Sequence, residues 1–132
     1  MASELKVNTL TGVSTAGSIA VTAEGNSTTT NLQQGLAKVW VDYSGSGTTY
    51  NDSFNSTSAT DNGTGDYTFT LTNSMGSTSY SGITDALNTD NNNFDCFMHT
   101  QAASSFSARL RVGDSGSDTD KETYGVAHGD LA

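Results

Sequence analysis

The chain has 132 residues, of which 33% are hydrophobic and 14% charged, and its formal net charge is −9. This length suits one domain, and the acidic balance argues against nucleic acid and anionic membranes as partners, because both require a basic footprint. The sequence has no apolar run long enough to cross a bilayer and no secretory signal at its start, so we expect neither membrane insertion nor export by that route.

The composition indicates β-structure. Serine, threonine, asparagine and glycine are abundant and proline is absent, which suits pleated strands joined by tight turns. Low hydrophobicity also occurs in disordered chains, but the 11 aromatic residues lie in alternating runs, which indicates a folded core. The single Cys96 excludes an intramolecular disulfide or a cysteine-rich zinc site, and we expect it to be a small buried hydrophobe.

Residues 1–35 contain no aromatic side chain. SELKVNTLTG alternates apolar and polar residues and predicts a short strand, and SIAVTAEG is a second short apolar run. In NLQQGLAK, the four-residue spacing of Leu32 and Leu36 allows a single helical turn. A segment with so few bulky side chains cannot bury a core, so we expect an extended arm that packs on something else.

From Lys38 onward the pattern is that of strands. KVWVDYS places Val39, Val41 and Tyr43 on one face and Trp40 on the other, and YNDSFNS predicts a weaker strand. DNGTGD is typical of a hairpin connection, with Asn62-Gly63 supplying positive φ. YTFTLT then predicts a strand antiparallel to the one before, with its aromatic face inward and its threonine face toward water.

The remaining sequence predicts a short strand near Tyr80 and Ile83 and one helical turn at residues 85–88. Three further strands follow, FDCFMHT, SSFSARLRVG and ETYGVAHG, with Arg109 and Arg111 facing outward. The predicted fold is therefore all-β. An N-terminal extended arm, residues 1–35, precedes a small antiparallel β-sandwich head, jelly-roll-like, over residues 36–132, with six or seven strands.

Catalytic and metal patterns are weak. His99 lies three residues from Cys96, on the opposite strand face, and no G-x-S-x-G elbow occurs, so we expect no enzyme, with polysaccharide degradation as a remote alternative. The acidic loops at residues 90–95 and 114–120 lack the EF-hand pattern, and ordinary turn chemistry explains them. We expect no cofactor, and calcium stays open as a weak alternative at three carboxylates: Asp114, Asp118 and Asp120.

Trp40 is the most informative residue, because a tryptophan on a wet face usually has a partner surface. A subunit interface is favoured over a sugar-stacking platform, since Trp40 follows the Leu32/Leu36 segment directly. The second reading is a carbohydrate-binding module, acting through Trp40, Tyr43 or Tyr50. Loop residues of the kind found in adaptable binding surfaces suggest host contact at Tyr80, Asn91, Asn92, Asn93 and Ser117.

The sequence also resembles a known family. SELKVNTLTG, NLQQGLAKVWVDYSGSGT, DSFN and DNGTGDYTFTLTN, within residues 3–73, resemble tail-fibre-type virion proteins of tailed bacteriophages, including marine phage fibres. The resemblance implies a structural trimer whose N-terminus binds other virion proteins and whose β-rich head points outward. The loop residues named above then suggest a host cell-surface glycan as a further partner. The resemblance also implies release by lysis from the host cytoplasm, where the chain is made, and a final location in the virion.

Residue by residue, the resemblance assigns two sets of positions. The three-chain junction matches Leu32, Leu36 and Trp40. The spacer between arm and head is short compared with most phage fibres, so a capsid fibre or capsid decoration protein stays an alternative to a short tail fibre. The virion attachment segment matches Ser3, Glu4, Leu5, Lys6, Val7, Asn8, Thr9 and Leu10.

Overall fold

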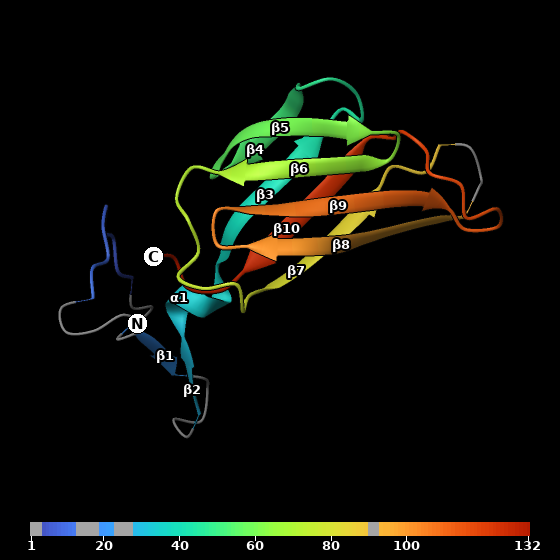
Figure 1. Ribbon diagram of the computed structural model, residues 1–132. Helices are drawn as coiled ribbons and strands as arrows, with labels where there is room; N and C mark the ends of the chain where they lie inside the picture. Colours follow the sequence, from blue (N-terminus) through green and yellow to red (C-terminus); the bar gives the residue numbers. More distant parts are fainter. Residues whose placement is uncertain (1–3, 13–18, 23–27, 90–92) are drawn as a thin grey trace. The chain divides into compact units, whose positions relative to one another are not determined.

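The computed structural model describes residues 4–12, 19–22, 28–89 and 93–132, and the chain forms two compact units (Figure 1). The N-terminal unit is Met1–Leu36 and the C-terminal unit is Ala37–Ala132. The sequence predicts a division after residue 35, one residue earlier. No helix in the described part of the chain is long and apolar enough to cross a membrane.

The N-terminal unit holds a two-stranded antiparallel ribbon and one helical turn. Strand β1 (Ala20–Thr22) pairs with β2 (Thr29–Asn31), and α1 (Leu32–Gly35) follows directly. Asn31 caps the helix, because its side-chain oxygen accepts from the backbone N–H groups of Gln33 and Gln34 at 2.8 and 3.2 Å. The single helical turn predicted from the spacing of the two leucines is confirmed.

The strand predicted for SELKVNTLTG is wrong for its described part, residues 4–12, which adopts no regular structure. Its side chains face water: Leu5 is 81% exposed, and Val7 and Leu10 are each 56% exposed. A strand needs a neighbour for its backbone hydrogen bonds, and within the described residues this segment pairs with none.

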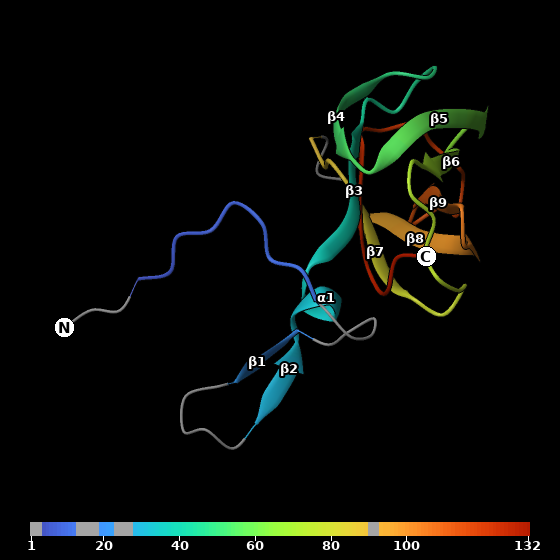
Figure 2. The same cartoon turned by 90° about the vertical axis from the view of Figure 1, so that its left-hand side faces the viewer.

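The C-terminal unit contains two four-stranded antiparallel sheets that pack face to face, seen edge-on in Figure 2. The first sheet has the order β4-β3-β10-β7 and the second the order β5-β6-β9-β8. The fold is thus all-β and consistent with a β-sandwich. Eight strands are described where the sequence predicts six or seven: β3 (Ala37–Tyr43), β4 (Tyr50–Phe54), β5 (Ser56–Gly63), β6 (Asp66–Leu71), β7 (Ser81–Ala86), β8 (Phe94–Ala102), β9 (Ser105–Val112) and β10 (Thr123–His128).

The strand order differs from the jelly-roll-like arrangement expected. Consecutive strands of a jelly roll mostly cross between its two sheets. Here three short turns keep consecutive strands together as hairpins, β3-β4, β5-β6 and β8-β9, and β10 returns between β3 and β7. The short polar turns in the sequence therefore determine a hairpin-rich sandwich.

The core lies between the sheets and is aromatic. Tyr43 of the first sheet meets Tyr67 of the second with ring centroids 4.8 Å apart, and Phe69 meets Phe106 at 5.1 Å. Every one of these four side chains is fully buried, and tilted ring pairs of this kind add to the energy of burial. The inward faces predicted for KVWVDYS and YTFTLT are confirmed.

Two predicted details of the strands are wrong. The partner of β6 is β5, Ser56–Gly63, part of which the sequence predicts to be turn, and the hairpin reverses at Thr64-Gly65. Asp85 and Ala86 belong to β7 and not to a helical turn, because Thr123 of β10 pairs with Ala86. In both cases a neighbouring strand supplies hydrogen bonds that overrule the local turn propensity.

Candidate functional site

The outer face of the first sheet carries four large apolar side chains in one line. Cross-strand register places Phe54 opposite Trp40, Trp40 opposite Val126, and Val126 opposite Ile83. Ile83 is 70% exposed, Phe54 52% and Trp40 37%, and Val126 is half-buried. We call Phe54, Trp40, Val126 and Ile83 the apolar row. It crosses all four strands, from one edge of the sheet to the other.

A second line of side chains lies two residues further along each strand. Asp42 faces Asp52 on β4 and Tyr124 on β10, and Tyr124 faces Asp85 on β7. We call Asp52, Asp42, Tyr124 and Asp85 the acidic row. The Tyr124 hydroxyl donates to Glu122 at 2.8 Å, which raises the pKa of Tyr124 to about 12. The row thus places carboxylates beside an exposed apolar line.

A shallow depression of about 270 Å³ lies where the two rows meet. Trp40, Ile83 and Val126 contribute apolar walls, and Tyr124 and Asp85 close the side toward the acidic row. Its surface is almost entirely carbon, so it suits an apolar side chain from a partner. The rows and this depression form the candidate binding face.

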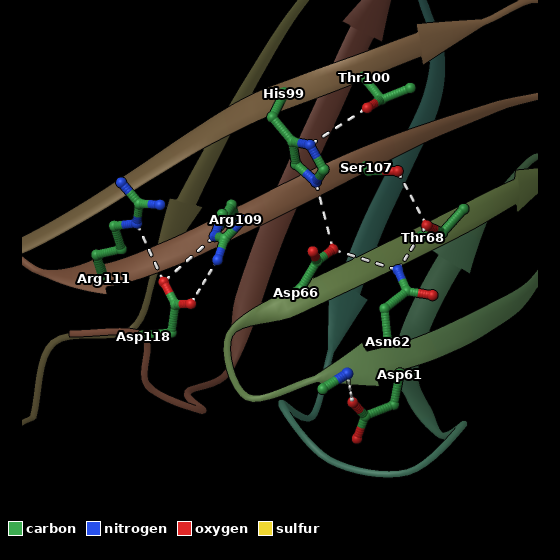
Figure 3. A network of polar contacts seen from close by, with 11 residues as sticks. Asp61, Asn62, Asp66, Thr68, His99, Thr100, Ser107, Arg109, Arg111 and Asp118 are labelled. Carbon is green, nitrogen blue, oxygen red and sulfur yellow. Dashed lines mark hydrogen bonds and ion pairs between the residues drawn. The ribbon is translucent and has the colours of Figure 1, made fainter. Parts of the chain in front are cut away.

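The outer face of the second sheet is different, because it carries a network of hydroxyl and charged side chains (Figure 3). Asp66 accepts from Asn62 at 3.2 Å and lies 3.3 Å from Nε2 of His99. Thr68 bonds Ser107 on the neighbouring strand at 2.9 Å. These side chains pair with each other across strands, so the face is polar and internally satisfied.

An arginine pair continues this polar face. The Arg109 guanidinium donates to both oxygens of Asp118, at 2.6 and 3.2 Å, and Arg111 donates to Asp118 at 3.0 Å (Figure 3). The hydrogen bond from Arg109 is the main cause that lowers the pKa of Asp118, and the same contact raises the pKa of Arg109. The network ties the loop before β10 to β9.

This pair makes stability depend on pH. A carboxyl whose folded-state pKa is lowered contributes stability above its unfolded pKa, and the contribution disappears as the pH falls through the folded value. We expect Asp118→Asn to lower the free energy of unfolding at about pH 7, and we expect the difference from the unchanged protein to disappear as the pH falls through the lowered folded-state pKa of Asp118. Urea unfolding across this range measures the difference. Asp114→Asn, on the same loop, is the control, and an equal loss in both variants would contradict the assignment.

On the second sheet, His99 lies between a carboxylate and a hydroxyl. The carboxylate is next to Nε2 and the hydroxyl next to Nδ1, which is the reverse of the arrangement in a Ser-His-Asp catalytic triad. Asp66 lies on Nε2 of His99, and the neighbouring Thr100 hydroxyl lies 3.2 Å from Nδ1. Both partners sit on an exposed strand face, where solvent competes for the same groups. Cys96 is half-buried on the other face of β8, and burial is the main cause that raises the pKa of its thiol. The prediction that Cys96 faces inward is therefore confirmed, but the side chain is half-buried and not fully buried as predicted.

Comparison of the chain with protein-family models, curated proteins and solved structures found no match. The surfaces available for binding are those of the N-terminal unit and the two outer faces of the C-terminal unit.

The predicted metal carboxylates have separate partners. Asp118 binds the two arginines, whereas Asp120 accepts from the Gly65 N–H at 2.7 Å and from the Tyr67 hydroxyl at 2.9 Å. Asp114 lies 3.4 Å from the Asn93 amide. Among the described residues no group of three metal-binding side chains converges. These carboxylates instead fasten their loop to the strands.

The predicted receptor residues are not all brought together. Asn93 and Ser117 are exposed near the start of β8 and the end of β9, while Tyr80 contacts the opposite end of that hairpin. The Tyr80 hydroxyl donates to Ala102 and Ser105 carbonyls at 3.2 and 3.0 Å, and burial raises its pKa. Tyr80 is thus a packing residue, which corrects its predicted role as a receptor contact. Two other predicted receptor positions, Asn91 and Asn92, lie outside the described residues.

The other predicted residues divide between the units. Leu32 and Leu36 belong to the N-terminal unit, and Trp40 to the C-terminal unit, where it is exposed as predicted. Of the proposed sugar platform, Tyr43 is fully buried and its hydroxyl donates to Gly47, so that role is wrong for Tyr43. The attachment segment is described from Glu4 onward. Ser3 lies outside the described residues.

Sequence reasoning missed Phe54, Val126 and Ile83 as neighbours of Trp40. Each is an apolar residue on a predicted strand. Alternation places Val126 and Ile83 opposite the inward residues of their strands, but it places Phe54 on the same face as Tyr50, and a register shift between β3 and β4 turns Phe54 outward. Their alignment depends on register between strands that lie far apart in the sequence. That register is seen only in the folded structure.

Proposed function

We propose that the chain is a structural and adhesive component of a bacteriophage virion, a short homotrimeric fibre with no catalytic role. One observation carries the proposal: the buried hydrophobic core begins at Val39, so the described part of the N-terminal unit contributes nothing to it. An exposed apolar segment next to a folded unit is typical of a surface that another molecule covers. The resemblance of residues 3–73 to phage fibre proteins supports the same reading.

The leading segment is the proposed virion attachment site. Leu5, Val7 and Leu10 expose apolar side chains on an irregular backbone, and the Lys6 ammonium lies 3.4 Å from the Glu4 carboxylate. Such a segment can add its backbone and apolar side chains to a groove or sheet edge of a neighbouring virion protein. Whether that neighbour belongs to the tail or to the capsid separates the fibre from a decoration protein, which is the alternative.

The junction between copies is proposed at the helical turn. Within the N-terminal unit a groove of about 370 Å³ is lined by Val21, Leu32 and Leu36, and Leu36 is 54% exposed. Three copies placed around one axis would cover these side chains, at roughly 25 cal/mol for each Å² of apolar surface removed from water. The C-terminal unit, with its own core, would then point outward as the head.

Host contact is proposed at the exposed loops of the head. Asn93, Asp114 and Ser117 lie together at one end of β8 and β9, where amide, carboxylate and hydroxyl groups face water. These groups suit hydrogen bonding to the hydroxyls of a cell-surface glycan. The proposed location is therefore the virion surface, after assembly in the host cytoplasm.

Mass measurement in solution tests the assembly. We expect the full chain to be a trimer at micromolar concentration and the double variant Val21→Ser/Leu36→Ser to be a monomer, because hydroxyls remove the apolar contact. Ile83→Ser, at a site in the head that is even more exposed than Val21 and Leu36, is the control and should stay trimeric. A monomeric full chain would overturn the trimer, and absence of the chain from particles purified from a lysate that expresses it would overturn the virion assignment.

A further inference from the structure

The apolar row is an unusual surface for a chain of this composition. Only a third of the residues are hydrophobic, yet four large ones align across the outer face of the first sheet. Scattered exposed side chains are normal in proteins, whereas a continuous line of them marks a place where another molecule binds. Its central member is Trp40, and tryptophan is among the residues that contribute most to binding.

The acidic row specifies the charge of that molecule. Asp42 and Asp52 face each other directly across β3 and β4, and like charges in this arrangement destabilise a sheet. Asp85 and Glu122 place further carboxylates around Tyr124. Lys38 follows the same alternation on β3 but is only 5% exposed, so the accessible charge beside the apolar row is negative.

We propose that this face binds a protein partner whose contact surface carries an apolar strip flanked by lysine or arginine side chains. The strip covers the apolar row, and the cations relieve the repulsion between Asp42 and Asp52. A second copy of the chain that presented this same face is a poor occupant, because it would place the same carboxylates against Asp42, Asp52 and Asp85. The proposal does not depend on the virion assignment.

The depression beside Trp40 gives the partner an anchoring point. Trp40, Ile83 and Val126 surround it, so one apolar side chain of the partner loses its water there while its cationic neighbours reach Asp85 and Asp42. Interfaces concentrate their energy in such a central apolar contact, and charges at the rim determine which partners associate. The two rows together therefore set both affinity and charge preference.

Trp40 is the only tryptophan in the chain, so its fluorescence reports on this face alone. The probe is a short synthetic peptide that alternates valine with lysine, titrated into the full-length protein, with a twin peptide carrying glutamate in place of lysine. We expect the lysine peptide to shift the emission of Trp40 to shorter wavelength, because the indole loses water. The glutamate peptide should leave the emission unchanged.

Matched variants separate this site from general attraction to an acidic protein. Asp42→Asn/Asp85→Asn should weaken binding of the lysine peptide about tenfold, whereas Asp61→Asn/Asp114→Asn, with the same change of charge elsewhere, should weaken it less than about twofold. Asparagine keeps a side-chain oxygen for the hydrogen bonds that these residues accept. Equal weakening in both pairs, or an emission that never shifts, would overturn the proposal.

Self-association is the remaining outcome. If the Trp40 emission shifts with protein concentration in the absence of peptide, and Asp42→Asn/Asp85→Asn strengthens that shift, the occupant is a second copy and the proposal is overturned. A shift that requires the lysine peptide, at a constant molecular mass of the protein, supports a basic partner.

Discussion

Phe69→Ala is expected to lower the free energy of unfolding by about 3–5 kcal/mol and the melting temperature by more than about 10 °C. Phe69 lies in the middle of β6, fully buried, with its ring centroid 5.1 Å from that of Phe106 and 5.6 Å from that of Tyr43. Removing the ring leaves a cavity between the two sheets, because the neighbouring rings stay fixed by their own strands. Urea unfolding monitored by circular dichroism measures the change.

Phe97→Ala is the matched control for this prediction. Phe97 lies on β8 of the same sheet but on its outer face, 40% exposed, with the Arg111 guanidinium 5.7 Å from its ring centroid. Loss of that exposed contact should cost less than about 1 kcal/mol. If the two substitutions had similar effects, Phe69 would not lie in a packed core, and the face-to-face arrangement of the sheets would be wrong.

The sequence was sufficient for the inward faces of β3, β6 and β9. Val39, Val41 and Tyr43 alternate with polar residues in KVWVDYS, and Phe106, Ala108 and the other inward residues do so in SSFSARLRVG. Alternation has physical force here because the polar residues could not be buried without partners. A one-residue error in either strand would have reversed every side chain.

Strand pairing was not available from the same pattern. The order β4-β3-β10-β7 joins the beginning, middle and end of the C-terminal unit, and hydrophobic alternation does not state which strands are neighbours. This is why Trp40 was recognised as exposed while its neighbours Val126 and Ile83 were not. It is also why Tyr80 was assigned to a receptor loop, although its hydroxyl donates to backbone carbonyls of the β8-β9 hairpin.

The hydrogen-bond partners of the loop residues could not be predicted from the sequence either. In the sequence, Asp118 and Asp120 are interpreted as turn residues or weak metal ligands, because the pattern of a short acidic loop does not show which residues it contacts in the folded chain. In the structure each carboxylate meets a donor from a strand: Arg109 of the preceding strand β9 for Asp118, and Tyr67 of the more distant β6 for Asp120. Asp118 and Asp120 therefore join the loop to the strands of the sandwich.

Gly65→Ala is expected to destabilise the protein by about 3 kcal/mol or more. Gly65 has φ of +66° at the reversal of the β5-β6 hairpin, and an added Cβ would clash with the backbone oxygen of Leu110 and lie 2.8 Å from that of Thr119. The Gly65 N–H donates to Asp120, and its carbonyl accepts from the Leu110 N–H at 2.8 Å. The clash is with backbone, so the hairpin must move and weaken both hydrogen bonds.

Gly47→Ala isolates the part of this effect that comes from backbone conformation. Gly47 has φ of +67°, almost the same as Gly65, but an added Cβ there meets no atom within 4 Å. Its substitution should therefore cost only the left-handed conformation, about 1–2 kcal/mol. Comparing the two variants by urea unfolding measures the cost of crowding alone. If Gly65→Ala lowered the free energy of unfolding no more than Gly47→Ala, the β5-β6 hairpin would not be packed closely against β9. The hydrogen bond from Gly65 to Asp120 would then not hold the hairpin in place.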